Sequence, residues 1–523
     1  MKRSSLLLLV AITMPAMAQD PYLNNSVINV SDVFGTSRYV SMGGAMGALG
    51  ADISVISSNP AGIGLFTKND VSLTAGASWL ANNSARQYSD GTFAQFNQLG
   101  AVVSFKGNGM VRNFNLAFNY QKKADYNSSF YGEVHTAASW ADQLWGLSCE
   151  AYDNRNLLYP SNPDNFNNTL YALGDVSGLF DKVENEIVKS DNDKHSTIGV
   201  TRGSLSAYDI NFSVNLNNRC YLGVTVGIDN VDFRRGTDYW EERMDADGRL
   251  QDFGYINEQV VSGNGYNLKF GAIVRPFESS PFRLGFTVET PTWFTLTYND
   301  DQRLTTHYDV DKDNNLVYDD DARNKYYYYA YDLADAYINY LEYYLNTPWK
   351  VRVQMGSTIS RNFAWGLEYE FANYSGTTMR FPSNYGGSVV DAGFKDMTRN
   401  QLKPQHTFRA GVEFKPTNSL SLRAGYNLIS STTYQDSYWD PFDADCSVAY
   451  PTGLDYMNLS DVHIITAGIG YRYRWLYADL AYKYRRQTGE YYAFNSEWSG
   501  LTNTSIPVDL SKHSITATIG VRF

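Results

Sequence analysis

The chain has 523 residues, of which 15% are aromatic and 19% are charged, and its formal net charge is −12 at pH 7. Its mean hydropathy of −0.38 excludes a helical membrane protein, and no apolar run after the first twenty residues is long enough to cross a bilayer as a helix. The acidic balance argues against nucleic acid as a partner and is typical of a solvated, acidic surface.

The amino terminus has the pattern of a secretory signal. Two basic residues begin it, an apolar core follows over 6–14, and small residues suited to cleavage stand at 16–18. The apolar core is too short to be a membrane anchor. We therefore expect residues 1–18 to be removed and the mature chain to begin near Gln19.

A segment rich in glycine and other small residues, 19–68, separates this signal from the first predicted strand. It contains the runs Met42-Gly-Gly-Ala45 and Asn59-Pro-Ala-Gly62. Glycine permits tight turns and close packing against a wall, but such a segment cannot build a core of its own. A disordered periplasmic tail is the alternative, yet the segment is too apolar for that. We predict that residues 19–68 form a hatch, or plug, inside the barrel that follows.

Apolar and polar residues alternate along most of the remaining chain. In the last segment, Ile515, Ile519 and Phe523 fall on one side of an extended strand, whereas Ser514 and Arg522 fall on the other. A strand that is apolar on one face only, repeated many times, is typical of an outer-membrane barrel. A two-residue period of this length does not fit a helix.

The same test along the chain predicts fourteen strands. They are 69–80, 98–106, 113–123, 204–216, 219–233, 256–275, 281–298, 347–360, 362–374, 404–416, 419–430, 461–473, 475–486 and 512–523. An even number fits a closed antiparallel barrel with both ends on one side. A secreted β-sandwich or propeller is the alternative, but it lacks the terminal aromatic residue.

The connections alternate between short and long. Links such as Asn217-Asn218 are short, whereas 132–203 and 299–346 are long. Because periplasmic turns are short and extracellular loops are long, both termini are predicted to be periplasmic. Residues 69–523 are thus assigned to an all-β transmembrane barrel.

The two longest connections exceed the length of loops that have no structure of their own. Partial helical periodicity occurs at 133–152, 169–188 and 325–345. It predicts small helices that cap the extracellular mouth.

An acidic stretch in the second long loop has the spacing of an EF-hand-like calcium site. Asp309, Asp311, Asp313 and Asp320 stand at positions one, three, five and twelve. Asn314 replaces the usual glycine, and the last ligand is aspartate rather than glutamate. A solvated acidic loop is the alternative. We expect no cofactor to be required and any calcium bound here to be structural.

The three cysteines do not describe a disulfide framework, because their number is odd. Cys149 and Cys446 fall in long loops, while Cys220 begins a predicted strand. Whether Cys149 and Cys446 pair stays open.

Alternation sends a set of charged residues into the lumen: Arg352, Arg409, Arg423, Lys483 and Arg522, with Glu368, Glu370, Glu413 and Asp479. Unpaired buried charge is costly, so most of them are predicted to pair with one another. One surplus cation near the hatch could bind the carboxylate of a fatty acid.

The hatch segment resembles that of a known family. Arg38, Met42-Gly-Gly-Ala45, Asp52 and Asn59-Pro-Ala-Gly62 occur in the order of the hatch signature of the FadL/TodX-type outer-membrane transporters of long-chain fatty acids and hydrocarbons. Distant members of that family are labelled hemin receptors. The resemblance extends over the mature chain and is weaker in the loops.

The resemblance implies passive transport of hydrophobic or amphipathic molecules. Such a ligand is caught between extracellular loops, moves to a pocket beside the hatch and leaves laterally into the membrane. The hatch residues that the resemblance implicates are Arg38, Gly43, Gly44, Asn59, Pro60, Ala61 and Gly62. A purely structural turn is the alternative for Asn59, Pro60 and Ala61.

The resemblance also implies residues for first capture. They are Trp140, Leu144, Trp145, Leu147, Leu179 and Phe180 in the first long loop, and Tyr337, Ile338, Leu341, Tyr344 and Leu345 in the second. The alternative is that these apolar faces only hold the loops together.

The expected partners are a hydrophobic ligand, outer-membrane lipid and lipopolysaccharide, and the barrel-assembly machinery through the last strand; a monomer is expected. Haem uptake is one rival function, although an energised receptor needs about twenty-two strands and a larger plug. A barrel enzyme is another, but no Gly-x-Ser-x-Gly motif occurs, so we expect no enzyme. A hydrophilic porin is the third, and the apolar plug argues against it.

Overall fold

A computed structural model describes most of the chain. The described residues are 21–29, 32–141, 143–144, 193–244, 250–310, 328–360, 362–383, 386–438, 453–495 and 503–523. The predicted signal, 1–18, lies outside them. No helix in the described part is long and apolar enough to cross a bilayer.

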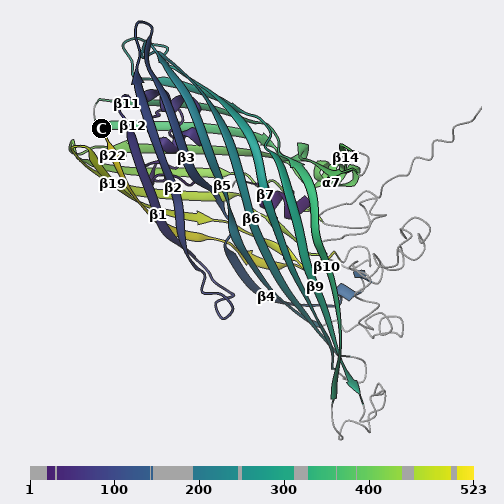
Figure 1. Ribbon diagram of the computed structural model, residues 1–523. Coiled ribbons are helices and arrows are strands. Elements are labelled where there is room, and N and C mark those ends of the chain that lie inside the picture. The colour runs from purple at the N-terminus through teal and green to yellow at the C-terminus, as the bar shows by residue number, and fades with distance from the viewer. Residues whose placement is uncertain are drawn as a thin grey trace, which may run out of the picture.

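The strands form a closed antiparallel barrel (Figure 1). Closure comes from β1 (Asp70–Leu80), which pairs with both β2 (Thr92–Lys106) and β22 (Lys512–Arg522). The ring continues through β3 (Val111–Asp125), β5 (Asp193–Leu216), β6 (Cys220–Met244), β7 (Leu250–Val274), β8 (Arg283–Glu289), β11 (Lys350–Ile359), β12 (Phe363–Asn373), β15 (Pro404–Phe414), β16 (Leu420–Ile429), β18 (Val462–Tyr473) and β19 (Leu476–Arg486). The predicted fourteen-stranded barrel is therefore confirmed.

The outer face is an apolar belt. On β15, Phe408, Val412 and Phe414 are exposed, whereas Thr407 and Glu413, which alternate with them, are buried inside. The other strands of the ring repeat this pattern, with exposed leucine, valine, isoleucine and aromatic side chains. Such a belt is the surface of a barrel that lies in lipid.

Tight turns join the strands at one end of the barrel, which we call the turn end; the other is the loop end. Asn217 and Asn218, between β5 and β6, have φ of 52° and 56°. Leu216 pairs with Cys220, so three residues form this turn, and asparagine tolerates the left-handed conformation of the first two well.

Two neighbouring strands of the barrel wall are interrupted at the same level. Residues 290–292 separate β8 from β9 (Trp293–Val310), and 347–349 separate β10 (Tyr328–Asn346) from β11. Pro291 and Pro348 stand in these breaks, and proline has no N–H for the ladder. Beyond the breaks, β9 and β10 continue the wall of the barrel as a long hairpin (Figure 1).

Two expectations for the long loops are wrong. The predicted helix at 325–345 is a strand from Tyr328 onward, because pairing with β9 satisfies its backbone and tyrosine-rich sequences favour strands. The helix predicted from residue 133 begins later, since β4 (Ser128–Thr136) pairs with the start of β5. Helical residues follow at Trp140, Ala141 and Leu144. The predicted helix at 169–188 lies outside the described residues.

Smaller elements cover the loop end. Between β12 and β15 lie η5 (Tyr374–Gly376), β13 (Thr378–Pro382), β14 (Ser388–Val390) and α7 (Ala392–Gln401). A separate small sheet is formed by β17 (Tyr456–Leu459), β20 (Thr488–Tyr492) and β21 (Ile506–Asp509). The amino-terminal helices lie inside the barrel and appear in purple in Figure 1: α1 (Pro21–Ile28), α2 (Ser37–Ser41), η1 (Ile53–Ser57) and η2 (Pro60–Leu65).

Candidate functional site

Residues 32–66, which we call the lumen segment, fold against the inner wall of the barrel. Polar side chains start each of its helical turns. Thr36 caps α2 by accepting from Tyr39 N, and Asp52 caps η1 by accepting from Ser54 N. The Thr36 hydroxyl also donates to Asp52 at 2.8 Å, which joins the two turns. The segment is thus folded by local capping rather than by a core of its own.

Asn59 has two structural roles. Its side chain caps η2 by accepting from Ala61 N at 3.1 Å, with Pro60 at the first helical position. The same side chain donates to Gln354 Oε1 on β11 at 2.8 Å. Ala61 is fully buried against the wall residues Tyr221 and Ile273. The Asn-Pro-Ala run therefore combines a turn with an attachment to the wall.

Arg38 connects the lumen segment to a chain of buried charges. Its Nε donates to Glu413 at 3.1 Å, and its Nη1 donates to Ala51 O at 3.0 Å. Burial lowers the pKa of the Arg38 guanidinium, but the carboxylates of Glu413 and Asp52 outweigh this and raise it, so the side chain stays charged. Glu413 also accepts from Arg423 at 2.7 Å.

The predicted pairing of inward charges is confirmed. Arg352 binds Glu370 at 2.6 Å, and Arg409 binds Glu368 at 2.6 Å. Arg423 binds Glu413 and Asp479. The other two cations pair with residues that the sequence did not suggest: Lys483 with Asp32, and Arg522 with Asp70.

Inward-facing glycines receive the lumen segment, and sequence reasoning missed them. Gly356, Gly366, Gly411 and Gly425 are directly opposite one another across β11, β12, β15 and β16. A Cβ at Gly411 would overlap the Met42 carbonyl oxygen, and one at Gly425 would overlap the Gly43 backbone. A second pair, Gly223 and Gly271, faces Asn59 and Pro60 in the same way. Backbone therefore lies directly on backbone here, which only glycine allows.

A small cationic cavity lies between the lumen segment and the wall. Its volume is about 60 Å³, and its lining includes Lys122, Lys123, Lys350, Arg352 and Arg409. Lys123 is paired with Asp229 at 2.8 Å. In the part of the chain that the structure describes, the Lys350 ammonium has neither a hydrogen bond nor an ion pair within 4.0 Å. It is the kind of surplus inward cation that the sequence left unidentified.

An apolar chamber lies nearer the loop end, and α1 fills it. Leu23, Val27 and Ile28 of α1 are almost fully buried there. The chamber wall is built by side chains of β5, β6, β7, β9, β10, β13 and α7: Leu205, Val231, Phe233, Val261, Phe294, Leu296, Tyr298, Tyr343, Leu345, Met379 and Phe394. Inward apolar residues are unusual in a water-filled bore, so the chamber is suited to an apolar occupant.

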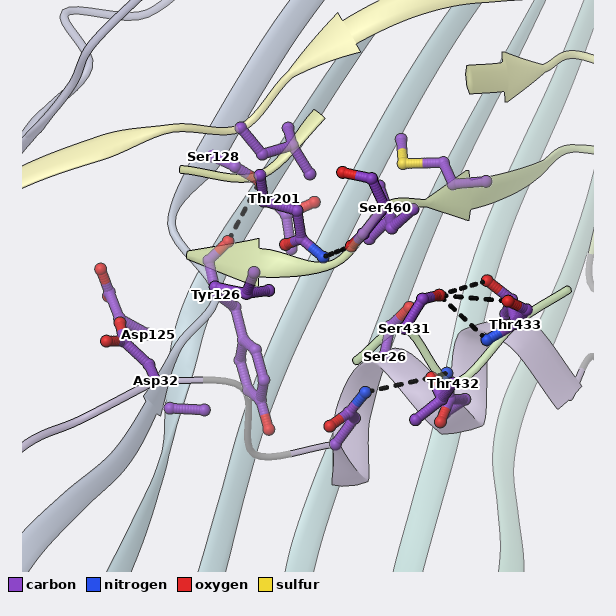
Figure 2. A pocket seen from close by; sticks show the side chains of 18 of the residues that line it. Ser26, Asp32, Asp125, Tyr126, Ser128, Thr201, Ser431, Thr432, Thr433 and Ser460 are labelled. Carbon is purple, nitrogen blue, oxygen red and sulfur yellow. Dashed lines mark hydrogen bonds between the residues drawn. The ribbon is translucent and has the colours of Figure 1, made fainter. Parts of the chain in front are cut away.

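Few polar contacts attach α1 to the wall. Asn25 donates to the Thr432 hydroxyl at 2.8 Å, and the Tyr343 hydroxyl donates to Asn24 at 3.0 Å. Beside α1 lies a cavity of about 170 Å³ (Figure 2). Ser431, Thr432 and Thr433 lie on one side of it, with Tyr126 and Asp125 on another (Figure 2). The chamber is thus almost filled but not closed.

The predicted capture residues that the structure describes lie in more than one cluster. Leu345 belongs to the apolar chamber, and Leu341 packs against it. Trp140 and Leu144 are fully buried in a different cluster with Tyr239. The Tyr344 hydroxyl donates to Glu342. Tyr337 and Ile338 lie on β10, and the remaining four, Trp145, Leu147, Leu179 and Phe180, fall outside the described residues.

The predicted calcium loop falls mostly outside the described residues. Asp309 lies on β9, opposite Tyr329 of β10, whereas Asp311, Asp313 and Asp320 are outside. The described residues contain no group of three acidic, histidine or cysteine side chains that could hold a metal ion. Calcium binding stays a prediction. Cys149 and Cys446 also lie outside the described residues.

No protein-family model matches the chain, and no curated protein matches it. Among solved structures, a Pseudomonas aeruginosa FadL homologue is 13% identical, with a TM-score of 0.50 over 94% of this chain and 99% of the homologue. The CymD monoaromatic hydrocarbon channel is 10% identical, with a TM-score of 0.47 over 95% and 98% of the two chains. The Ralstonia pickettii toluene transporter TbuX is 11% identical, with a TM-score of 0.45 over 95% and 100%. The resemblance read from the sequence is confirmed at the level of the fold.

Proposed function

The chain folds as the Pseudomonas aeruginosa FadL homologue does, and on that premise we propose that it carries hydrophobic or amphipathic small molecules passively across the outer membrane. The observation that carries the proposal is the apolar chamber inside the barrel, which α1 fills with Leu23, Val27 and Ile28. A chamber lined by apolar side chains does not favour the binding of a polar solute. An alkyl chain or an aromatic ring gains about 0.8 kcal/mol for each methylene removed from water there.

The ligand site in this proposal is the chamber itself, with α1 as the competing occupant. A ligand of similar shape can replace the apolar contacts of α1, and it also has to offer acceptors to the buried hydroxyls of Tyr126 and Tyr343, which now donate to Val27 O and to Asn24. The 170 Å³ cavity beside α1 offers a point of entry. Cavities near this size accommodate a molecule such as benzene.

Lys350 supports an anionic head group as part of the preferred ligand. It lies in the cationic cavity, where the neighbouring cations are already paired with carboxylates. A carboxylate placed there would give the Lys350 ammonium a direct partner, in addition to the attraction of the Glu289 and Glu370 carboxylates that also line the cavity. An amphiphile with one carboxylate and a long apolar part, such as a fatty acid, fits both sites.

Passage beyond the cavity requires the lumen segment to rearrange, because the segment blocks the bore. Asn59 is the residue through which a change in the turn is transmitted to the wall, since its side chain bonds both Ala61 N and Gln354. Lateral exit into the membrane would spare an alkyl chain from crossing water.

A competition experiment tests the site. The double substitution Leu23→Ala and Val27→Ala weakens the hold of α1 on the chamber by about 2–5 kcal/mol. It should therefore tighten binding of palmitate to the detergent-solubilised protein at least tenfold, as measured by isothermal titration calorimetry. Substituting Lys350→Gln should weaken palmitate binding but leave hexadecanol binding unchanged.

The contradicting results are specific. If neither palmitate nor hexadecanol binds, or if the α1 variant binds both more weakly, the chamber is not the ligand site. Hemin and a p-nitrophenyl ester belong in the same series. Tight binding of hemin alone would favour the haem function, and turnover of the ester would favour an enzyme.

The hatch has its own test. Replacing Asn59, Pro60 and Ala61 with a glycine–serine sequence removes both the cap and the wall attachment. It should reduce palmitate uptake into proteoliposomes while the barrel still runs as a folded, heat-modifiable band in gels. Unchanged uptake would exclude a gating role and leave the run as a structural turn.

A further inference from the structure

Tyrosine–histidine pairs repeat on the outer face of the barrel. In each of three neighbouring hairpins, a tyrosine hydroxyl lies at hydrogen-bond distance from a histidine Nδ1: Tyr369 and His406 at 2.8 Å, Tyr426 and His463 at 2.8 Å, and Tyr482 and His513 at 2.7 Å. Half of the six histidines of the chain are used in this way. One repeated geometry on three hairpins indicates a shared purpose.

The three pairs have the same register. Tyr369 is opposite Phe408, and Phe371 is opposite His406, so the pair is diagonal across β12 and β15. The pairs on β16–β18 and β19–β22 are diagonal in the same sense, with Leu428 and Tyr484 opposite the histidines. In every case the tyrosine lies on the strand that runs toward the loop end and the histidine on the strand that returns.

The pairs mark the upper edge of the apolar belt. Below His406 on the same face of β15 come Phe408, Val412 and Phe414, all of them exposed. The distance along the strand from His406 to Phe414 is about 27 Å, which at the usual strand tilt corresponds to about 20 Å of the lipid-facing band, whose height is about 25 Å in such barrels. Short turns face the periplasm in these barrels, so the pairs belong to the extracellular leaflet.

Each pair has two hydrogen-bond directions, which correspond to the two tautomers of the neutral imidazole. In the direction that the proposal uses, the tyrosine O–H donates to Nδ1, and the imidazole proton is then on Nε2. In the described part of the chain, the Nε2 atoms of His406, His463 and His513 have no protein partner. Arg486 is exposed on β19 directly opposite His463 and adds a guanidinium. One acid, Asp461, is exposed nearby, and its carboxylate accepts from Ser431 N.

We propose that this surface, the three pairs with Arg486, which we call the Tyr–His face, binds the phosphate groups of lipopolysaccharide. Imidazole and guanidinium N–H groups are good donors to phosphate oxygens. The glucosamine phosphates of lipid A lie at the edge of the hydrocarbon, which is where the apolar belt ends and these donors begin. Acyl chains then cover the exposed phenylalanine, valine and isoleucine side chains below.

The test compares two lipids and two sets of variants. Native mass spectrometry would count the lipid molecules retained after incubation with bisphosphorylated lipid A or with its dephosphorylated form. The triple substitution His406→Phe, His463→Phe and His513→Phe keeps the rings and the belt but removes the N–H donors. The matched control, Tyr120→Phe with Tyr208→Phe, changes two rings on β3 and β5 whose centroids lie 5.2 Å apart in a tilted arrangement.

We expect the triple variant to retain bisphosphorylated lipid A about tenfold less than the wild type, in line with the loss of charge-assisted hydrogen bonds. The control should behave as the wild type, and dephosphorylated lipid A should bind all three proteins equally. Equal retention of the two lipids by the wild type, or no effect of the triple variant, overturns the proposal. If the triple variant does not fold, Arg486→Gln, at an exposed position, decides the question by the same measurement.

Discussion

The lumen segment and α1 both lie inside the barrel, but they contact its wall in different ways. The lumen segment rests its backbone on inward glycines, so that Met42 and Gly43 approach Gly411 and Gly425 with no side chain between them. In contrast, α1 contacts the wall mainly through apolar side chains, with a few polar contacts such as that of Asn25 with Thr432.

This difference separates what a ligand can displace from what it cannot. A backbone-to-glycine contact has no equivalent in a small molecule, and the ion pair of Arg38 with Glu413 reinforces it. Contacts between apolar side chains are non-directional, so an alkyl chain can take over those of α1. We therefore expect ligand binding to start with α1 and to reach the lumen segment second.

The largest effect should come from adding side chains to the glycine row, by which we mean Gly356, Gly366, Gly411 and Gly425. The double substitution Gly411→Ala and Gly425→Ala places two methyl groups where backbone atoms of Met42 and Gly43 now lie. Overpacking of this kind costs about 3 kcal/mol or more and should release the lumen segment from the wall. Trypsin should then cleave after Arg38 in the folded barrel.

A matched control lies on the same barrel. A Cβ at Gly236 of β6 meets nothing within 4 Å, so Gly236→Ala should leave the cleavage pattern unchanged. Resistance of the double variant to trypsin would mean that the wall yields instead, and the distinction between the two regions would then be lost.

A smaller effect is expected from Arg38→Gln. The change leaves Glu413 with two ion-pair partners, Arg423 at 2.7 Å and Lys415 at 3.3 Å, so the cost should be about 2 kcal/mol, below that of leaving a buried carboxylate with no partner. Faster hydrogen exchange in residues 36–52, with α1 unaffected, is the expected result. Arg219→Gln breaks an exposed pair with Glu278, worth at most about 1 kcal/mol, and serves as the control. Equal effects of the two substitutions would contradict an anchoring role for Arg38.

The barrel was predictable within the lipid belt and less so beyond it. A strand that lies in lipid must alternate between apolar and polar side chains, and this is why the fourteen strands could be found from the sequence. Strand β6 was expected to end at Phe233 but continues to Met244. The part just after Phe233 reads Arg234-Arg-Gly-Thr-Asp238, which has no apolar residue to mark a lipid-facing side.

The site was predictable in its parts but not in its arrangement. The Asn59 cap and the charge pairs follow from local rules on capping and burial. The glycine row does not, because it depends on the registers of four strands, which bring Gly356 and Gly366 opposite each other. Its signal was present, since each glycine occupies an inward position of a predicted strand. The apolar chamber was missed because β10 was expected to be a helix.

The smallest effect concerns α7, the helix whose Phe394 is part of the apolar chamber. Asp391 caps α7 by accepting from Phe394 N at 2.9 Å, and burial raises the pKa of its carboxyl to about 6. An acid whose pKa is raised by folding favours the folded state while protonated, so this contribution is complete below about pH 4, fades as the pH rises to 6 and is absent above. Protection factors of α7 amides, corrected for intrinsic exchange, should therefore fall about tenfold between pH 5 and pH 7. Asp391→Asn keeps the acceptor but cannot ionise, so it should abolish this dependence.

The same measurement tests the contrast between α1 and the lumen segment. Phe394 of α7 is part of the apolar chamber that α1 fills. We therefore expect the protection of α7 and α1 to depend on pH and that of the lumen segment to stay unchanged.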